Sequence, residues 1–487
     1  MAMDRMDEAT VDDVQREMAA GRLTAADLVL HYMSRIAALD GGEGGLRSIL
    51  EVNPDALQIA EALDRERAVR GPRGPLHGVP VVLKDNIDTA DRMHTSAGSL
   101  ALAESYAARD AHLVTRLRAA GAVVLAKTNM TEWANFMADE MPSGYSSRGG
   151  QVRNPYGPGR LDPGGSSAGS AVSVNANLTL LAVGTETSGS ILNPASQNGI
   201  VGVKPTVGLV SRAGVIPISH SQDTAGPMAR TVRDAALLLD VLAGVDGDDP
   251  VTATQEGRLG PGLALGLDAG ALAGARLGVV REPFYARLDA ARLAVMEAAF
   301  ACLREAGAEV IEPVRLAHAE TRVGFDVLVH EFKPALNAYL GRLGAAVPVH
   351  SLGELIAYNE ARPERMLRYG QAQLRRAEAT SGALTEAAYV RALIDGRRRS
   401  RAEGIDRSME EHRLDALLFP GSLGAAVAAA AGYPSVTVPA GLTDVGAAVG
   451  LTFTATAFTE GRLLALAYAF EQACAGRQPP RFENASA

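Results

Sequence analysis

Residues 162–191, DPGGSSAGSAVSVNANLTLLAVGTETSGSI, hold two clusters of glycine and hydroxyl residues on either side of an ordinary hydrophobic stretch. The clusters are GGSS at 164–167 and TSGS at 187–190. Glycine lets the backbone approach another group closely, and a neighbouring serine can attack, donate or accept. Two flexible loops would have the same composition, so the interpretation depends on residues elsewhere in the chain.

The overall composition excludes several classes of function. The chain has 487 residues, of which 47% are hydrophobic and 21% charged, and its net charge is −9. An acidic balance disfavours nucleic acids and anionic membranes as partners. The acidic N-terminus lacks the pattern of a signal peptide, and no apolar run approaches the roughly 20 residues that would span a bilayer. These features predict a globular, cytoplasmic protein.

The two cysteines, Cys302 and Cys474, lie far apart in the sequence and outside any CxxC motif. This spacing predicts neither a disulfide framework nor a zinc site, and it favours a reducing compartment. The nine histidines are scattered, without an HExxH motif, so metal chemistry is not expected either. No Walker phosphate-binding motif is present.

Lysine is rare in this chain. Only four of the 47 Lys and Arg residues are lysines, namely Lys84, Lys127, Lys204 and Lys333. A buried lysine can lose its proton, whereas arginine stays charged. A retained lysine is therefore a candidate for proton transfer, with chance as the alternative. Three of the four lie within residues 84–204, the block that contains both Gly/Ser clusters.

The order of expected elements favours a layered α/β sheet. Short buried strands are predicted at 79–83, 122–126 and 178–183, with a helix capped by Asp110 between the first two. Thr10, Thr24 and Thr231 are predicted helix N-caps. Residues 276–414 are helix-rich, and the C-terminal part returns to strands before a helix at about 460–474. No internal repeat or long linker divides the chain.

A serine, a second serine and a lysine form the most favourable chemical combination. A serine hydroxyl is a poor nucleophile until a base takes its proton, and lysine is a base only when its pKa falls well below about 10.4. Burial of Lys84 at a strand end would lower it. Of the two candidate serines, Ser166 and Ser190, one can act as the nucleophile while the other relays its proton to Lys84, and backbone N–H groups of 187–190 can form an oxyanion hole.

A competing motif occurs in the first cluster. Residues 165–169, GSSAG, match the GxSxG nucleophile elbow of α/β-hydrolases, which must follow a strand. The preceding residues 154–163, NPYGPGRLDP, are rich in proline and glycine and disfavour a strand there. The elbow is therefore not the preferred interpretation.

Three blocks resemble the amidase signature family, namely HGVPVVLKDNID, the GGSS cluster, and GTETSGSILNPASQNGIVGVKPTVGLVSR. The resemblance covers nearly the whole chain and is weakest over 276–414. It implies that Lys84 is the base, that Ser166 is a bridging serine after a cis peptide bond, and that Ser190 is the nucleophile. It also implies backbone oxyanion donors at Thr187, Ser188 and Gly189, and no cofactor.

The resemblance implies a fold as well, with a large central mixed β-sheet covered by helices on both faces. We expect a single domain over 1–487, with a catalytic block at 76–230 and a variable helix-rich region at about 276–414. The expected partner is a small-molecule amide or carbamate, and the protein is expected to be a monomer or homodimer. TEWANF and GTETSGS resemble the stand-alone, peptide amidase-like branch of the family.

Substrate-binding residues are harder to predict. The segment after Lys127 contains the single tryptophan and ends in a Ser/Gly-rich loop, so it can line a substrate pocket, although its large side chains can equally be core. Ser188 departs from the family's usual Gly or Asp and lies beside the same pocket. The candidate substrate contacts are Met130, Trp133, Met137, Tyr145 and Ile191.

Several functions fit these residues. The preferred one is a serine amidohydrolase acting on a linear amide, such as a peptide C-terminal amide, an aryl amide or an aliphatic amide. A carbamate (urethane) or ester hydrolase would use the same residues. A glutaminase-type subunit of a tRNA-dependent amidotransferase and a binding protein that has lost the chemistry are further alternatives.

Overall fold

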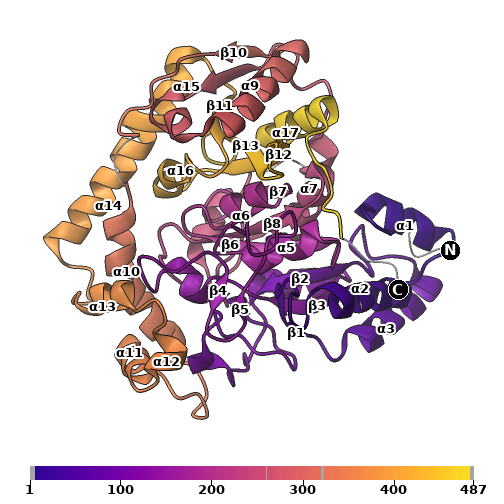
Figure 1. Cartoon of the computed structure of the whole chain (residues 1–487), viewed down its shortest axis with the longest axis vertical. Coiled ribbons are helices and arrows are strands. Elements are labelled where there is room, and N and C mark those ends of the chain that lie inside the picture. Colours follow the sequence, from indigo (N-terminus) through magenta and orange to yellow (C-terminus); the bar gives the residue numbers. More distant parts are fainter. Residues whose placement is uncertain (1–5, 259, 261, 320–322, 483–487) are drawn as a thin grey trace.

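The molecule is organised around a mixed β-sheet (Figure 1). The computed structural model describes residues 6–258, 260, 262–319 and 323–482. Within these residues, eleven strands follow the order β1-β3-β2-β6-β8-β7-β12-β13-β11-β9-β10. The strands are β1 Ile49–Val52, β2 Pro80–Lys84, β3 Val123–Thr128, β6 Leu181–Glu186, β7 Val201–Lys204, β8 Thr224–Ala229, β9 Arg276–Val279, β10 Glu309–Ile311, β11 Ala416–Pro420, β12 Ser435–Leu442 and β13 Ala448–Thr454.

Both strand orientations occur in this sheet. β2 pairs in parallel with β3 and β6, and β9 pairs in parallel with β10 and β11. The remaining pairs, including β6 with β8 and β12 with β13, are antiparallel. The predicted mixed sheet is confirmed. A separate small hairpin joins β4 Tyr145–Ser146 to β5 Gly150–Gln151.

Helices cover the sheet in two layers. α5 and α6 contact each other in one layer, whereas α4, α7, α17 and α9 contact one another in sequence in the other. α2 and α3 contact each other and pack on β2 and β3, and α1 lies beside them (Figure 1). The bounds are α1 Val11–Ala19, α2 Ala25–Leu39, α3 Ala56–Arg70, α4 His112–Ala119, α5 Ala168–Asn175, α6 Leu192–Gln197, α7 Val232–Leu242, α8 Arg281–Phe284, α9 Ala290–Glu305, α16 Ala425–Ala431 and α17 Glu460–Cys474.

The helix N-caps test the local sequence signals. Thr10, Thr24 and Thr231 each accept a hydrogen bond from the backbone three residues later, as predicted. The predicted cap at Asp110 is wrong. α4 begins after Ala111, and the Asp110 carboxylate instead accepts hydrogen bonds from the backbone N–H of Ala90 and from the Arg118 guanidinium. Arg118, two turns further along α4, binds the Asp110 carboxylate in a charge-assisted hydrogen bond, so this carboxylate does not cap the helix.

The helix-rich segment runs along one side of the molecule (Figure 1). The segment is rich in helices, as the sequence predicts. The helices are α10 Phe325–Leu340, α11 Leu352–Glu360, α12 Pro363–Met366, α13 Ala372–Glu378, α14 Ala387–Ser400 and α15 Asp406–His412, with a π-helical turn at Arg401–Ile405 between the last two. No helix in the described parts of the chain is long and apolar enough to cross a membrane.

Two apolar clusters make up most of the interior. The larger one flanks the sheet on both sides and includes the buried faces of α7 and α17. The second lies between residues 130–141 and the helices α10, α11 and α13. The segment that follows β3 is therefore packed against the helix-rich region rather than against the sheet.

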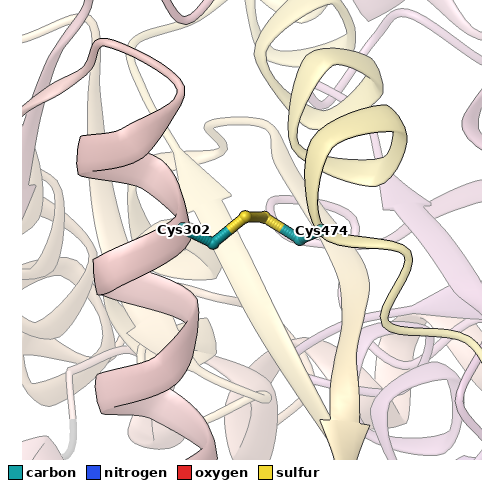
Figure 2. Close-up of a disulfide and its surroundings, with 2 residues drawn as sticks. All are labelled: Cys302 and Cys474. Carbon is teal, nitrogen blue, oxygen red and sulfur yellow. A yellow bond between two sulfur atoms is a disulfide. The ribbon is translucent and has the colours of Figure 1, made fainter.

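A disulfide joins Cys302 in α9 to Cys474 at the end of α17 (Figure 2). The Cα atoms are 6.1 Å apart, although 172 residues separate them in the sequence. The prediction that these cysteines form no disulfide is therefore wrong, because sequence distance says nothing about two helices that pack together on the sheet. The cytoplasmic location loses the support that free cysteines gave it and stays a prediction.

Removal of this disulfide is expected to destabilise the protein. A cross-link closing so long a loop restricts the unfolded chain, so Cys302→Ser should lower the free energy of unfolding by about 2–4 kcal/mol. Urea unfolding of wild type and variant measures the difference, and reductant should shift only the wild type. Two free thiols in the native, unreduced protein would contradict the pairing.

Candidate active site

Lys84 is the last residue of β2, and its side chain is completely buried. Its Nζ lies 2.7 Å from Ser166 Oγ, which is 82 residues away in the sequence. The same nitrogen lies 2.9 Å from the hydroxyl and 3.1 Å from the carbonyl oxygen of Thr185 on β6. Because β6 pairs with β2, the sheet itself brings these groups together.

Burial lowers the pKa of Lys84 to about 7, although the nearby carboxylates of Glu186 and Asp223 oppose the shift. A neutral amine has two N–H groups and one lone pair. The carbonyl and hydroxyl oxygens of Thr185 can accept the two N–H groups, which directs the lone pair towards the Ser166 hydroxyl. The arrangement therefore suits Lys84 to receive a proton from Ser166.

The other three lysines show that burial alone does not place a lysine beside a serine hydroxyl. Lys127 and Lys204 are also completely buried, and burial lowers the pKa of both, that of Lys204 to about 8. Their Nζ atoms bind backbone carbonyls, and Lys127 also binds the Thr95 hydroxyl. Lys333 forms an ion pair with Glu378. Of the four lysines, all of which lie in the described part of the chain, Lys84 is the one whose side-chain nitrogen contacts a serine hydroxyl.

Ser166 follows a cis peptide bond from Gly165. The Gly165 N–H donates to Asn193 Oδ1 at 3.0 Å, and the Ser166 carbonyl accepts from Thr131 N at 3.0 Å. A Cβ atom on Gly165 would lie 2.6 Å from Thr131 Oγ1, so only glycine fits between these partners. No strand precedes Ser166 within 152–165, which agrees with rejection of the nucleophile elbow.

Ser190 ends the turn that follows β6. The Glu186 carboxylate accepts the backbone N–H groups of Gly189, Ile191 and Leu192 at 2.7–3.0 Å. The backbone N–H of Ser167 donates to the Ser190 carbonyl at 3.1 Å, which joins the two Gly/Ser clusters directly. Ser190 is only 8% exposed, and its hydroxyl has no hydrogen bond to another described residue.

The turn leaves several backbone donors unused. In the described structure, the N–H groups of Thr187, Ser188 and Ser190 have no acceptor, whereas that of Gly189 already donates to Glu186. The Thr187 hydroxyl donates to Asp223 at 2.5 Å, and the Ser188 side chain is exposed. An anion placed against this turn would find unused donors beside the Ser190 hydroxyl.

Comparisons with known proteins identify the family. A family model described as Amidase matches residues 27–430. The chain belongs to the amidase signature family. The structure superposes on native peptide amidase from Stenotrophomonas maltophilia with a TM-score of 0.92 and 48% identity, over 98% of this chain and 99% of that one. The amidase signature fold predicted from the sequence is thereby confirmed.

Two curated relatives support the same conclusion. A probable amidase of Arabidopsis thaliana is 43% identical over 98% of this chain and 92% of its own length. A glutamyl-tRNA(Gln) amidotransferase subunit of Ralstonia nicotianae is 34% identical over 96% of this chain and 98% of its own. The protein is accordingly an amidase, an enzyme acting on carbon–nitrogen bonds.

The predicted substrate contacts of this amidase lie in packed surroundings. Met130, Trp133 and Met137 are buried in the second apolar cluster, and Ile191 is buried in the core around the sheet. Tyr145 is partly buried, at the edge of the second cluster. The alternative interpretation of Trp133 as a core residue agrees with its burial. A role for these five residues in substrate binding stays a prediction.

The amidase site also contains residues that the motifs did not single out. Glu186 shapes the turn, Thr185 orients Lys84, Asn193 holds the backbone of Gly165, and Asp223 anchors Thr187. The one available sequence signal was for Glu186: it is an acidic residue directly before a Gly/Ser turn, and the backbone N–H groups of such a turn need an acceptor. Among the described residues, no group of three His, Cys, Asp or Glu could hold a metal ion.

Proposed function

We propose that the protein is a serine amidohydrolase that cleaves a linear amide through an acyl-enzyme, with Ser190 as nucleophile, Ser166 as proton relay and Lys84 as base. The observation that carries the proposal is the 2.7 Å contact between Lys84 Nζ and Ser166 Oγ. It gives a completely buried lysine, with a pKa of about 7, a serine hydroxyl from which it can take a proton.

In the first step, Ser190 Oγ attacks the carbonyl carbon of the substrate. The Ser190 proton passes to Ser166 Oγ, whose own proton passes to Lys84 Nζ. The negative charge on the tetrahedral intermediate is stabilised by backbone N–H groups of the turn. Thr187 and Ser188 have unused donors for this role; Gly189, also predicted, shares its N–H with Glu186.

In the second step, the Lys84 ammonium returns a proton through Ser166 to the leaving nitrogen. The C–N bond breaks, and the acyl group stays on Ser190 as an ester. Water then attacks the ester and gives its proton to the same relay, which releases the carboxylic acid and regenerates the Ser190 hydroxyl. The sequence of steps consumes one water and requires no other reactant.

The substrate class we favour is a peptide C-terminal amide. The support is the similarity to the Stenotrophomonas maltophilia peptide amidase, which extends over nearly the full length of both chains. Carbamates and esters present the same carbonyl and are the alternative substrates. The similarity to the Ralstonia nicotianae amidotransferase protein, at 34% identity, keeps a glutaminase-type function as a less favoured alternative.

A panel of leaving groups tests this function. We expect the purified chain, without partner proteins, to release ammonia from an N-blocked dipeptide amide with a kcat/KM at least about tenfold above that for a matched anilide or carbamate. The methyl ester with the same acyl group is the control, because it shows whether the enzyme accepts that acyl group when the leaving group is more reactive. Activity confined to the carbamate would replace the amide assignment, and hydrolysis of no substrate by the isolated chain would favour a role within a complex.

A further inference from the structure

A buried carboxylate connects the helix-rich region to the catalytic block. Glu331 lies in the middle of α10 and is completely buried. One of its oxygens accepts the Tyr389 hydroxyl of α14 at 2.9 Å. The other accepts the Ser219 hydroxyl at 2.5 Å, together with the hydroxyl and the backbone N–H of Ser221 at 3.0 and 3.1 Å.

Most of these donors lie outside the helices. Ser219 and Ser221 lie in the loop 216–223 that leads into β8, and His220 between them approaches the same carboxylate at 3.3 Å. A buried carboxylate is costly unless several donors reach it. The loop must therefore take one position against α10, because its hydrogen bonds to Glu331 are made only there.

The same loop holds the turn of the active site. The backbone N–H groups of Ile218 and Ser219 donate to Asp223 Oδ2 at 2.8 and 2.9 Å. Asp223 Oδ1 accepts the Thr187 hydroxyl at 2.5 Å. Asp223 is buried, and burial raises the pKa of its carboxyl group. A continuous chain of hydrogen bonds therefore runs from Glu331 through the loop to the turn.

We propose that Glu331 is a positioning residue for the oxyanion turn, acting through Ser219, Asp223 and Thr187. The inference rests on the proposed function, since it assigns to Thr187 a backbone donor for the tetrahedral oxyanion. On this proposal, the helix-rich region holds the turn against the carbonyl group of the substrate. Lys84, Ser166 and Ser190 do not depend on Glu331 for their positions.

Loss of this support has a specific kinetic signature. A misplaced N–H donor weakens the stabilisation of the transition state but not the binding of the ground state, so kcat falls while KM stays constant. A residue that only stabilises the fold would lower the melting temperature and leave the kcat of the folded enzyme unchanged.

The experiment compares Glu331→Leu, Glu331→Gln and Ser219→Ala in the full-length protein. We expect Glu331→Leu to lower kcat about 10- to 100-fold, short of the loss of an entire donor, with KM within about threefold of wild type. Glu331→Gln should recover much of the activity, because its amide oxygen can still accept the Ser219 hydroxyl. Ser219→Ala removes the same hydrogen bond to Glu331, so its kcat should lie between the values for Glu331→Leu and Glu331→Gln.

A second readout reports on the oxyanion site itself. A peptide aldehyde forms a tetrahedral adduct with a nucleophilic serine, and its oxygen takes the place of the oxyanion. Its inhibition constant should rise by the same factor as kcat/KM falls, whereas that of the peptide acid, a ground-state probe, should stay constant. Titration with a fluorophosphonate gives the concentration of active enzyme, so misfolded protein does not enter the rates.

The controls remove comparable groups elsewhere. Glu460 is a completely buried carboxylate that accepts the Thr206 N–H, and Ser408 is a buried serine that bonds backbone carbonyls. Glu460→Leu and Ser408→Ala should lose stability without loss of kcat. Unchanged kcat in Ser219→Ala and in folded Glu331→Leu, or unchanged aldehyde inhibition of these two variants, overturns the inference; if Glu331→Leu does not fold, unchanged kcat in Ser219→Ala alone does so. Wild type that neither hydrolyses amides nor reacts with the fluorophosphonate overturns the proposed function instead.

Discussion

Lys84→Arg is expected to lower kcat/KM by about 10²- to 10⁴-fold, the usual contribution of a general base. The side chain at 84 is completely buried, and burial lowers the pKa of the lysine to about 7, so it can be neutral at physiological pH. Arginine keeps its charge under all ordinary conditions and cannot take the proton of Ser166. Steady-state hydrolysis of a peptide amide at pH 8 measures the loss.

Lys84→Met is the matched control, since it removes the amine while keeping an unbranched buried chain. Both variants should give the circular dichroism spectrum of the folded wild type, and both should be equally inactive. Activity of Lys84→Arg above about a tenth of wild type would contradict a neutral-lysine base.

The pH profile gives an independent check on the same group, because a pKa lowered to about 7 leaves Lys84 neutral above that pH. The wild-type kcat/KM should therefore fall about tenfold per pH unit below pH 7, and a flat profile down to pH 5 would exclude this base.

Ser190→Ala is expected to lower kcat by about 10⁴-fold or more, as removal of a nucleophile from a serine hydrolase does. Ser190 is slightly exposed and ends the turn anchored by Glu186, whereas Ser166 is completely buried against Lys84. A fluorophosphonate should label the wild type at a single serine. Mass spectrometry of the labelled peptide identifies the position.

Ser166→Ala separates nucleophile from relay. It keeps the Ser190 hydroxyl but loses the contact that reaches Lys84 Nζ, so labelling of Ser190 should persist at a much lower rate. Label on another serine in the Ser190→Ala protein, or activity of that protein above about one per cent of wild type, would remove Ser190 from the proposed role.

Some features of the chain were readable from local sequence because their causes are local. A threonine with an acidic residue three positions later forms the N-caps at Thr10 and Thr24. The helix predicted at about 460–474 is observed as α17, at Glu460–Cys474. The three motif blocks carry the family resemblance, and the comparisons confirm that family. The rarity of lysine also makes Lys84, Lys127 and Lys204 candidates for proton transfer, and all three are buried with lowered pKa values.

The features that require contact between distant segments of the chain are determined by the tertiary structure. The contact of Lys84 with Ser166 spans 82 residues, and the fall in the lysine pKa depends on how completely the sheet and its helices exclude water. The Cys302–Cys474 disulfide and the bond between Glu331 and Ser219 join segments more than a hundred residues apart. A one-dimensional pattern records which residue types are present, but burial and partner choice arise only when separate elements pack, and these determine which lysine becomes a base and which loop supports the turn.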